Sequence, residues 1–220
     1  MLADVPGLAL KLLDAAAFWL FRQSVLILFR LLFGYRVRGL VPRTGPCVVV
    51  ANHTSFLDAL LLGGVTARRM RFVMTDEYAN VRGLRWFLRW NRVLLVREHA
   101  RSSRKVFADV QAVLEAGGVV AIFPEGGISQ DGRLQPLQPG VLLMAERAGV
   151  PLVPVGISGA FRALPRHRSW PRPATITCRV GEAIRVEELL PPERKRKEAL
   201  LCGAERLRLS LAELVESSLN

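Results

Sequence analysis

The chain has 220 residues, the length of one ordinary domain, and its 50% hydrophobic composition excludes an intrinsically disordered protein. A formal net charge of +12 favours an anionic partner, whether nucleic acid, anionic lipid or a phosphorylated substrate. The mean hydropathy of +0.25 is high for a soluble enzyme and indicates apolar surface that contacts lipid. Cys47, Cys178 and Cys202 have neither disulfide nor zinc-ligand spacing, so we expect a reducing compartment and no metal site.

Residues 1–34 are predicted to associate with a membrane. Residues 8–33 are mostly apolar, but four charged residues interrupt them: Lys11, Asp14, Arg22 and Arg30. No clean run of 18 apolar residues remains, so we expect one or two helices that lie in the interface or dip into it rather than span it. Trp19 would lie at the boundary, and the arginines would extend to lipid phosphates. A signal peptide is the alternative, but no convincing cleavage site follows.

Residues 35–192 alternate between strand and helix patterns, which predicts an α/β domain with one mixed sheet and flanking helices. Strands are expected at residues 47–51, 71–74, 93–96, 119–123, 152–157 and 176–180. Helices are expected from residue 56 to 62, from 102 to 116 and from 139 to 148, the last two ended by glycines.

The C-terminal segment, residues 193–220, is predicted to be an amphipathic helix packed on this domain. Five apolar residues follow helical spacing: Leu200, Ala204, Leu207, Leu211 and Leu214. A coiled-coil partner helix is the alternative, but the stripe is too short for sustained heptads.

A histidine and an aspartate after the first buried strand form the candidate catalytic pair. His53 lies at the strand exit, where ligands of α/β sheets bind, and Asp58 follows five residues later. Because residues five apart on a helix point about 140° away from each other, the pair can meet only if His53 lies in the loop before the helix. Ser55 as N-cap would arrange this. On these residues alone, Asp58 fits equally well as the last member of a Ser-x-x-Asp capping motif.

A second apolar strand ends in the run Phe123-Pro124-Glu125-Gly126-Gly127, whose glycines let backbone N–H groups approach a ligand. Two further apolar runs lie at residues 93–97 and 150–155. In order and spacing, the four segments resemble the four motif blocks of the bacterial 1-acyl-sn-glycerol-3-phosphate acyltransferase family. The resemblance extends from about residue 36 to 159.

The resemblance implies an O-acyltransferase that moves a fatty acyl chain from a thioester to the free hydroxyl of 1-acyl-glycerol-3-phosphate, making phosphatidate. It implies that His53 is the general base, Asp58 its orienting partner, Arg97 a phosphate-binding residue, and Glu125 with Gly126 an acceptor-binding loop. The expected partners are the bilayer, a lysophosphatidate-type acceptor, and acyl-CoA or acyl carrier protein as donor. No bound cofactor is expected, and the expected location is the cytoplasmic face of the inner membrane, peripheral or monotopic.

The sequence departs from the family's pattern at two places. Gly127 and Ile128 stand where threonine and arginine usually follow the first glycine, and residues 137–140 are neutral where relatives often carry a basic residue. Acceptor-phosphate binding would then depend on Arg97, Arg133 and backbone donors near Gly126 and Gly127. A different lyso-acceptor, such as a lysophospholipid or a lyso-amino-acid lipid, therefore stays open. So does a catalytically silent lipid-binding protein, against which the intact His53 and Asp58 argue.

Residues 68–105 hold eleven Lys and Arg against three Asp and Glu. Four arginines follow helical spacing on one face: Arg82, Arg85, Arg89 and Arg92. Trp86 and Trp90 lie beside them, which predicts an interfacial helix that docks on the membrane; a merely solvated charged face is the alternative. Nucleic-acid binding is disfavoured because no recognised nucleic-acid module is visible.

Overall fold

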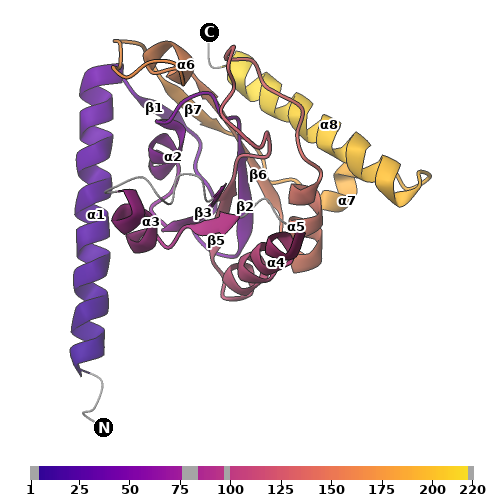
Figure 1. Ribbon diagram of the computed structural model, residues 1–220, viewed down its shortest axis with the longest axis horizontal. Helices are drawn as coiled ribbons and strands as arrows, with labels where there is room; N and C mark the ends of the chain where they lie inside the picture. Colours follow the sequence, from indigo (N-terminus) through magenta and orange to yellow (C-terminus); the bar gives the residue numbers. More distant parts are fainter. Residues whose placement is uncertain (1–4, 76–83, 97–99, 218–220) are drawn as a thin grey trace.

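The computed structural model describes residues 5–75, 84–96 and 100–217, and a seven-stranded sheet forms its centre (Figure 1). The strands are β1 Arg36–Arg38, β2 Cys47–Ala51, β3 Met70–Thr75, β4 Leu94–Val96, β5 Val119–Ile122, β6 Leu152–Ser158 and β7 Thr177–Val180. Their order is β1-β7-β6-β2-β5-β3-β4, and only the β6–β7 pair is antiparallel. The predicted α/β fold with one mixed sheet is confirmed.

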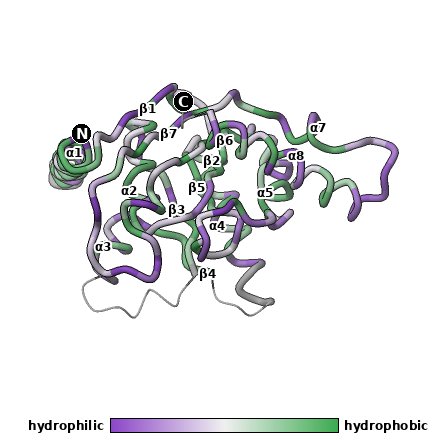
Figure 2. Tube along the Cα trace, turned by 90° about the horizontal axis from the view of Figure 1, so that it is seen from above, coloured by the Kyte–Doolittle hydropathy of each residue, from purple (hydrophilic) through white to green (hydrophobic). Residues whose placement is uncertain are grey.

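Helices cover both faces of the sheet. They are α1 Val5–Phe33, α2 Asp58–Leu61, the 3-10 helix η1 Leu62–Gly64, α3 Leu84–Trp90, α4 Ala100–Glu115, α5 Gly140–Ala148, α6 Ala160–Ala163, α7 Val186–Leu189 and α8 Arg196–Glu216. The buried side chains of α1, α2 and α6 form one core, and those of α4, α5, α7 and α8 form the other. Figure 2 shows α1 end-on at one side of the molecule and α8 on the opposite side.

The central strands are buried on both faces because they read as continuous apolar runs, as parallel strands covered by helices do. In β2, Val49 and Ala51 face one core while Val48 and Val50 face the other, as the alternation of strand side chains requires. This double burial holds the carboxyl end of β2 in place. The loop that carries His53 begins there.

The expected strands and helices differ from the observed ones mainly at their ends. The predicted 56–62 helix is shorter: α2 begins at Asp58 and passes into η1 at Leu62. The helix predicted at the C-terminus is observed as α8, which buries Ala199, Leu200, Gly203, Ala204, Leu207 and Leu211. The strand β1 and helices α6 and α7 were not expected, because segments of three or four residues carry too little periodicity.

The N-terminal segment is one helix of 29 residues, and two of its four charged side chains, Asp14 and Arg22, bond to the domain, whereas Lys11 and Arg30 are exposed. Asp14 forms an ion pair with Arg69 at 2.8 Å, and Arg22 donates from Nε to the backbone oxygens of Gly63 and Thr66. The expectation that the arginines extend to lipid phosphates is therefore wrong for Arg22. By length and composition the stretch Leu8–Phe33 could also cross a membrane, although four charged residues interrupt it.

The outer face of α1 is apolar. Its exposed large side chains are Leu8, Leu10, Leu12, Leu13, Trp19, Leu20, Ile27, Leu28, Leu31 and Leu32. A helix that bonds to the domain through Asp14 and Arg22 and exposes many large apolar side chains suits contact with lipid along its outer face.

The predicted interfacial helix around Arg85 and Arg89 is corrected by the structure. Trp90 packs on α1, where its Nε1 donates to Asp14 Oδ1 at 2.9 Å, so its indole is not directed at head groups. Arg92 lies beyond the end of α3 with a φ of 51°, so it does not continue the arginine face. Arg82 lies outside the described residues. Trp86 remains 69% exposed and stacks on Trp90.

Candidate active site

Two loops meet at the carboxyl edge of the sheet because β2 and β5 are parallel neighbours. His53 follows β2, and Glu125 follows β5. The backbone N–H of His53 donates to Glu125 Oε1 at 2.6 Å, and the backbone N–H of Ser129 donates to the carbonyl of His53 at 2.8 Å. The backbone of His53 is thus held on both sides by the loop that follows β5.

The side chains of His53 and Asp58 meet: the distance from His53 Nδ1 to Asp58 Oδ2 is 3.0 Å. His53 lies in the loop before α2, the placement that the five-residue spacing requires. The His53 side chain is 18% exposed, whereas Asp58 is fully buried. The imidazole therefore lies between a buried carboxylate and an opening that a substrate can reach.

Asp58 also caps the turn in which it lies. Its Oδ2 accepts the backbone N–H groups of Thr54 at 2.6 Å and Ser55 at 2.8 Å. Ser55 is not the formal N-cap of α2, which is Leu57, but its hydroxyl accepts the N–H of Leu57 and donates to the carbonyl of Leu164. The capping role and the pairing with His53 are compatible, because one carboxylate oxygen serves both.

The hydrogen bonds determine which tautomer His53 adopts. Asp58 Oδ2 already accepts two backbone N–H groups, so His53 Nδ1 carries the proton and donates, and Nε2 keeps its lone pair. Burial raises the pKa of the Asp58 carboxyl, and the hydrogen bond from His53 is the largest opposing influence. The other carboxylate oxygen of Asp58, Oδ1, is buried without a hydrogen-bond partner in the described part of the chain. The pair is suited to remove a proton at Nε2.

The imidazole is stacked on Phe123, with ring centroids 4.1 Å apart and planes 16° apart. Phe123 is the first residue of the run that continues through Glu125 and Gly127. One face of the histidine ring is thereby covered by an apolar surface, which limits its rotation. Sequence reasoning assigned Phe123 to a strand and did not predict this contact.

Glu125 joins the loop of His53 to the segment of Gln135 through hydrogen bonds to its two carboxylate oxygens. Oε1 accepts the N–H of His53, and Oε2 accepts the N–H of Gln135 at 2.8 Å. Burial raises the pKa of Glu125, and these two backbone N–H groups oppose that rise. Gly126 and Gly127 are exposed beside it, and Gly126 has a φ of 80° with Gln138 Nε2 where a Cβ would lie.

Of the two arginines predicted to bind phosphate, the structure describes only Arg133. Arg97 lies outside the described residues. Arg133 is exposed in the loop that follows Gly127, where its backbone N–H donates to Asp131 Oδ1 at 3.0 Å. Ile128, one of the positions where a cation was expected from the family pattern, is buried.

Asn52, directly before His53, is a site residue for which the sequence analysis predicted no role. Its side chain accepts the backbone N–H of Ile157 at 2.7 Å and donates to the carbonyl of the same residue at 2.9 Å. These bonds join the end of β2 to β6 directly beside His53. Its place next to the histidine was the signal available in the sequence, but the partner lies 105 residues away.

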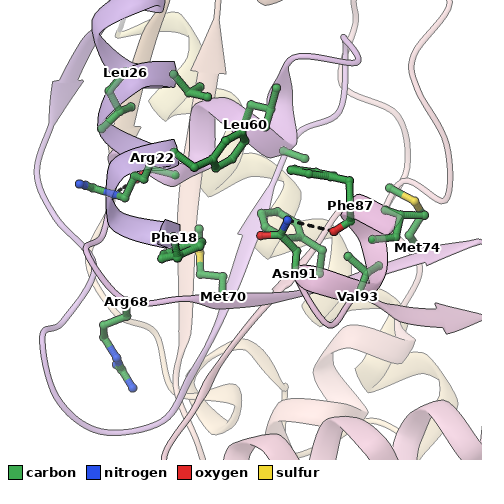
Figure 3. Close-up of a pocket in the computed structure, with 16 residues that line it drawn as sticks. Phe18, Arg22, Leu26, Leu60, Arg68, Met70, Met74, Phe87, Asn91 and Val93 are labelled. Carbon is green, nitrogen blue, oxygen red and sulfur yellow. Dashed lines mark hydrogen bonds between the residues drawn. The ribbon is translucent and has the colours of Figure 1, made fainter. Parts of the chain in front are cut away.

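An apolar pocket lies beside this site, with about 720 Å³ of empty space that includes its open mouth (Figure 3). Side chains from α1, α2, β3, α3 and the turn after α3 converge on it, among them Phe18, Leu26, Leu60, Met74, Phe87 and Val93. The pocket adjoins the catalytic pair in two ways: Ala59 and Leu60 follow Asp58 in α2, and Phe72 stacks on Phe123. Phe72 in the pocket wall is thus joined to the His53 ring through Phe123.

Comparison with known proteins finds a family for this sequence: the family model described as Acyltransferase matches residues 35–158. The chain belongs to the acyltransferase family. It is 32% identical over 170 residues to a 1-acyl-sn-glycerol-3-phosphate acyltransferase of Chlamydomonas reinhardtii, covering 76% of this chain and 48% of that protein. It is 28% identical over 162 residues to the human beta enzyme of that name, covering 71% and 58%.

The acyltransferase fold is also found in a solved structure. The crystal structure of the 1-acyl-sn-glycerophosphate acyltransferase from Thermotoga maritima aligns with a TM-score of 0.70 at 24% identity, covering 88% of this chain and 77% of that one. The chain spans about half the length of the curated relatives it matches: it covers 58% of the human protein, 48% of the Chlamydomonas reinhardtii protein and 35% of a 1-acyl-sn-glycerol-3-phosphate acyltransferase from Brassica napus.

Proposed function

We propose that the chain transfers a fatty acyl group from a thioester to the free hydroxyl of 1-acyl-glycerol-3-phosphate, producing phosphatidate and a free thiol. The observation that carries the proposal is the His53–Asp58 pair at 3.0 Å, placed at the sheet edge beside an apolar pocket. Relatives named for this activity support it.

In the proposed reaction His53 is the general base. Its Nε2 takes the proton of the acceptor hydroxyl as that oxygen attacks the thioester carbon, a contribution of roughly 10² to 10⁴ in rate. Asp58 holds the Nδ1 proton and stabilises the imidazolium. The tetrahedral intermediate then expels the thiolate, which receives the proton from His53. The acyl chain passes directly to the acceptor, and backbone N–H groups stabilise the oxyanion.

The pocket is the proposed site of a fatty acyl chain. Its lining is almost entirely apolar, and each methylene removed from water contributes about 0.8 kcal/mol. Because the pocket lies against Phe72, which stacks on Phe123 beneath the His53 ring, a chain held in it would bring its carbonyl carbon to the imidazole.

The proposed location is the cytoplasmic face of the inner membrane. The apolar outer face of α1, together with charges that bond to the domain, supports a helix that lies along lipid while the domain stays outside the bilayer. In this proposal residues 1–34 are the membrane-associated segment, 35–192 the acyltransferase domain and 193–220 a helix packed on it.

A second acceptor class is supported by a specific observation. The family's usual cation is replaced by Ile128, and this side chain is buried rather than directed at a ligand. Arg97 and Arg133 remain the proposed phosphate contacts, with the backbone of Gly126 and Gly127. An acceptor with a less charged head group, such as another lysophospholipid, would need fewer cations.

Thiol release separates these acceptors. Detergent-solubilised protein is supplied with acyl-CoA or acyl carrier protein thioester, and lysophosphatidate is compared with lysolipids of neutral head group. Release that depends on His53 and is largest with lysophosphatidate is expected. His53-dependent release with another acceptor would move the protein to the second class, and no release with any pair would favour a silent lipid-binding protein.

A further inference from the structure

A large part of the positive charge gathers at the active-site edge without acidic residues to balance it. No Asp or Glu occurs from residue 15 to 57 or from residue 147 to 181. Six exposed arginines lie in these two stretches near the carboxyl ends of β2 and β6: Arg30, Arg36, Arg162, Arg166, Arg168 and Arg172. Within the described part of the chain, none of the six forms an ion pair.

The loop that follows α6 carries half of these arginines and an exposed indole. Residues 166–173 are all exposed, and Trp170 is 83% exposed, the highest value among the large exposed apolar side chains of the described residues. We call residues 166–172 the basic loop. Its base is closed by a hydrogen bond from the backbone N–H of Arg172 to the carbonyl of Ala163 at 2.8 Å. The loop therefore projects its arginines and Trp170 outward from a fixed base.

The basic loop is attached to the candidate active site. The hydroxyl of Ser55, two residues after His53, donates to the carbonyl of Leu164 at 2.7 Å. Phe161 lies where a Cβ of Gly132 would lie, so α6 also touches the loop that carries Arg133. A surface that binds the basic loop would thus be held close to the mouth of the site.

The same loop lies beside the end of α1. The backbone N–H of Ile176 donates to the carbonyl of Phe33 at 3.0 Å, and the N–H of Arg36 donates to the carbonyl of Ile176. Figure 1 shows the orange segment after α6 running beside the end of α1. The chain that leaves the basic loop thus bonds to the end of α1, where Arg30 and Leu31 are exposed.

We propose that the basic loop, with Arg30 and Arg36, docks the active-site edge on the anionic phospholipid head groups of a bilayer, with Trp170 in the head-group layer. Guanidinium groups bind head-group phosphates while an indole favours the boundary between head groups and hydrocarbon. The proposal rests on the proposed function in so far as that function places the site at a lipid surface. An acidic carrier protein would match the charge, but it offers no hydrocarbon boundary for Trp170 and the adjoining face of α1.

Flotation of the full chain with vesicles tests the docking surface. Neutral phosphatidylcholine vesicles are compared with vesicles that contain about 30% phosphatidylglycerol, enough to create a negative surface potential. The test variant is Arg166→Gln/Arg168→Gln/Arg172→Gln. The matched control is Arg194→Gln/Lys195→Gln/Lys197→Gln, which removes the same charge from exposed residues at the start of α8, on the far side of the molecule.

Wild type is expected to partition more strongly onto anionic vesicles than onto neutral ones, and the test variant to lose about 10-fold or more of that gain. The control should keep most of it. Trp170→Ala should weaken partition onto both kinds of vesicle. An unchanged gain in the test variant, or an equal loss in the control, would overturn the proposal.

Thiol release in detergent micelles separates this surface from catalysis. If the basic-loop variant binds vesicles normally and loses release only with acyl carrier protein thioester, the surface serves the donor protein and the lipid proposal is wrong. If wild type shows the lipid-charge dependence but releases no thiol, the docking surface stands and the proposed acyl transfer fails.

Discussion

At the scale of single residues, the imidazole of His53 performs the proposed proton transfer, while the backbone of His53 holds two loops together through hydrogen bonds. His53→Ala removes only the imidazole, because the hydrogen bonds of its N–H to Glu125 and of its carbonyl to Ser129 use backbone atoms. We therefore expect turnover to fall by roughly 10² to 10⁴ while the protein still folds, with a lower thermal midpoint because the buried Asp58 loses its hydrogen bond from the imidazole. Thiol release and a melting curve on the same preparation measure both. Activity close to wild type would contradict the mechanism.

Asp58→Asn tests whether the carboxylate and the imidazole act as a unit. The amide can donate to Nδ1, which would place the histidine proton on Nε2 and remove the base, so a loss of about 100-fold or more in kcat is expected. The double variant with His53→Ala should be no slower than His53→Ala alone, since both changes disable one function. Additive losses would indicate that Asp58 acts separately from His53.

The buried phenol of Tyr35 makes the stability of the protein depend on pH in the alkaline range. Its buried hydroxyl donates to the carbonyl of Leu61 at 2.6 Å, so Tyr35→Phe should cost about 1 kcal/mol at pH 7. Burial raises the pKa of Tyr35 far above its ordinary value of about 10. Above pH 10 only the unfolded chain therefore ionises there, and the wild type loses stability that the variant keeps.

The difference in unfolding free energy between wild type and Tyr35→Phe should consequently shrink as pH rises past about 10. Denaturant titrations at several pH values measure it. Burial also raises the pKa of Cys178, to about 12, but that thiol is present in both proteins. A difference that stays constant to pH 11 would mean that the folded protein exposes the phenol.

At the scale of elements, α8 lies close enough to β6 that one strand position must lack a side chain. A Cβ at Gly156 would lie 2.7 Å from the Cβ and the backbone of Leu214. Gly156→Ala should therefore destabilise the protein by about 1–3 kcal/mol, as overpacking does. Gly63→Ala is the matched control, because no atom lies within 4 Å of its Cβ. Equal thermal midpoints for the two variants would refute this packing.

The predicted and observed elements agree best where a pattern depends on local burial. Residues 47–51 and 119–123 are apolar because both faces of their strands are covered, and the expected strands lie within a residue of β2 and β5. The side of α1 on which Asp14 finds its partners cannot be predicted from neighbouring residues in this way. Asp14 was expected to interrupt a lipid-facing helix, yet its partners Arg69 and Trp90 lie 55 and 76 residues away.

At the scale of the whole molecule, the pocket exists only because α1 docks on the domain. Val25 lines the pocket from α1, whereas its neighbour Ser24 is exposed. Val25→Trp should narrow the pocket and lower kcat/KM for a 16-carbon donor by about 10-fold or more relative to a 10-carbon donor, since each excluded methylene loses about 0.8 kcal/mol. Ser24→Trp should leave that ratio unchanged. A ratio unaffected by Val25→Trp would place the acyl chain elsewhere.

The sequence alone determined the buried strands, the loop position of His53 and the family's motif spacing, because each depends on residues close together in the chain. Tertiary structure decided that Asp14 of α1 pairs with Arg69, that Trp90 bonds to Asp14 rather than facing lipid, and that Phe123 stacks on His53. It also brought the basic loop beside the end of α1. These features rest on hydrogen bonds and ring contacts between segments tens of residues apart or more, which no local periodicity records.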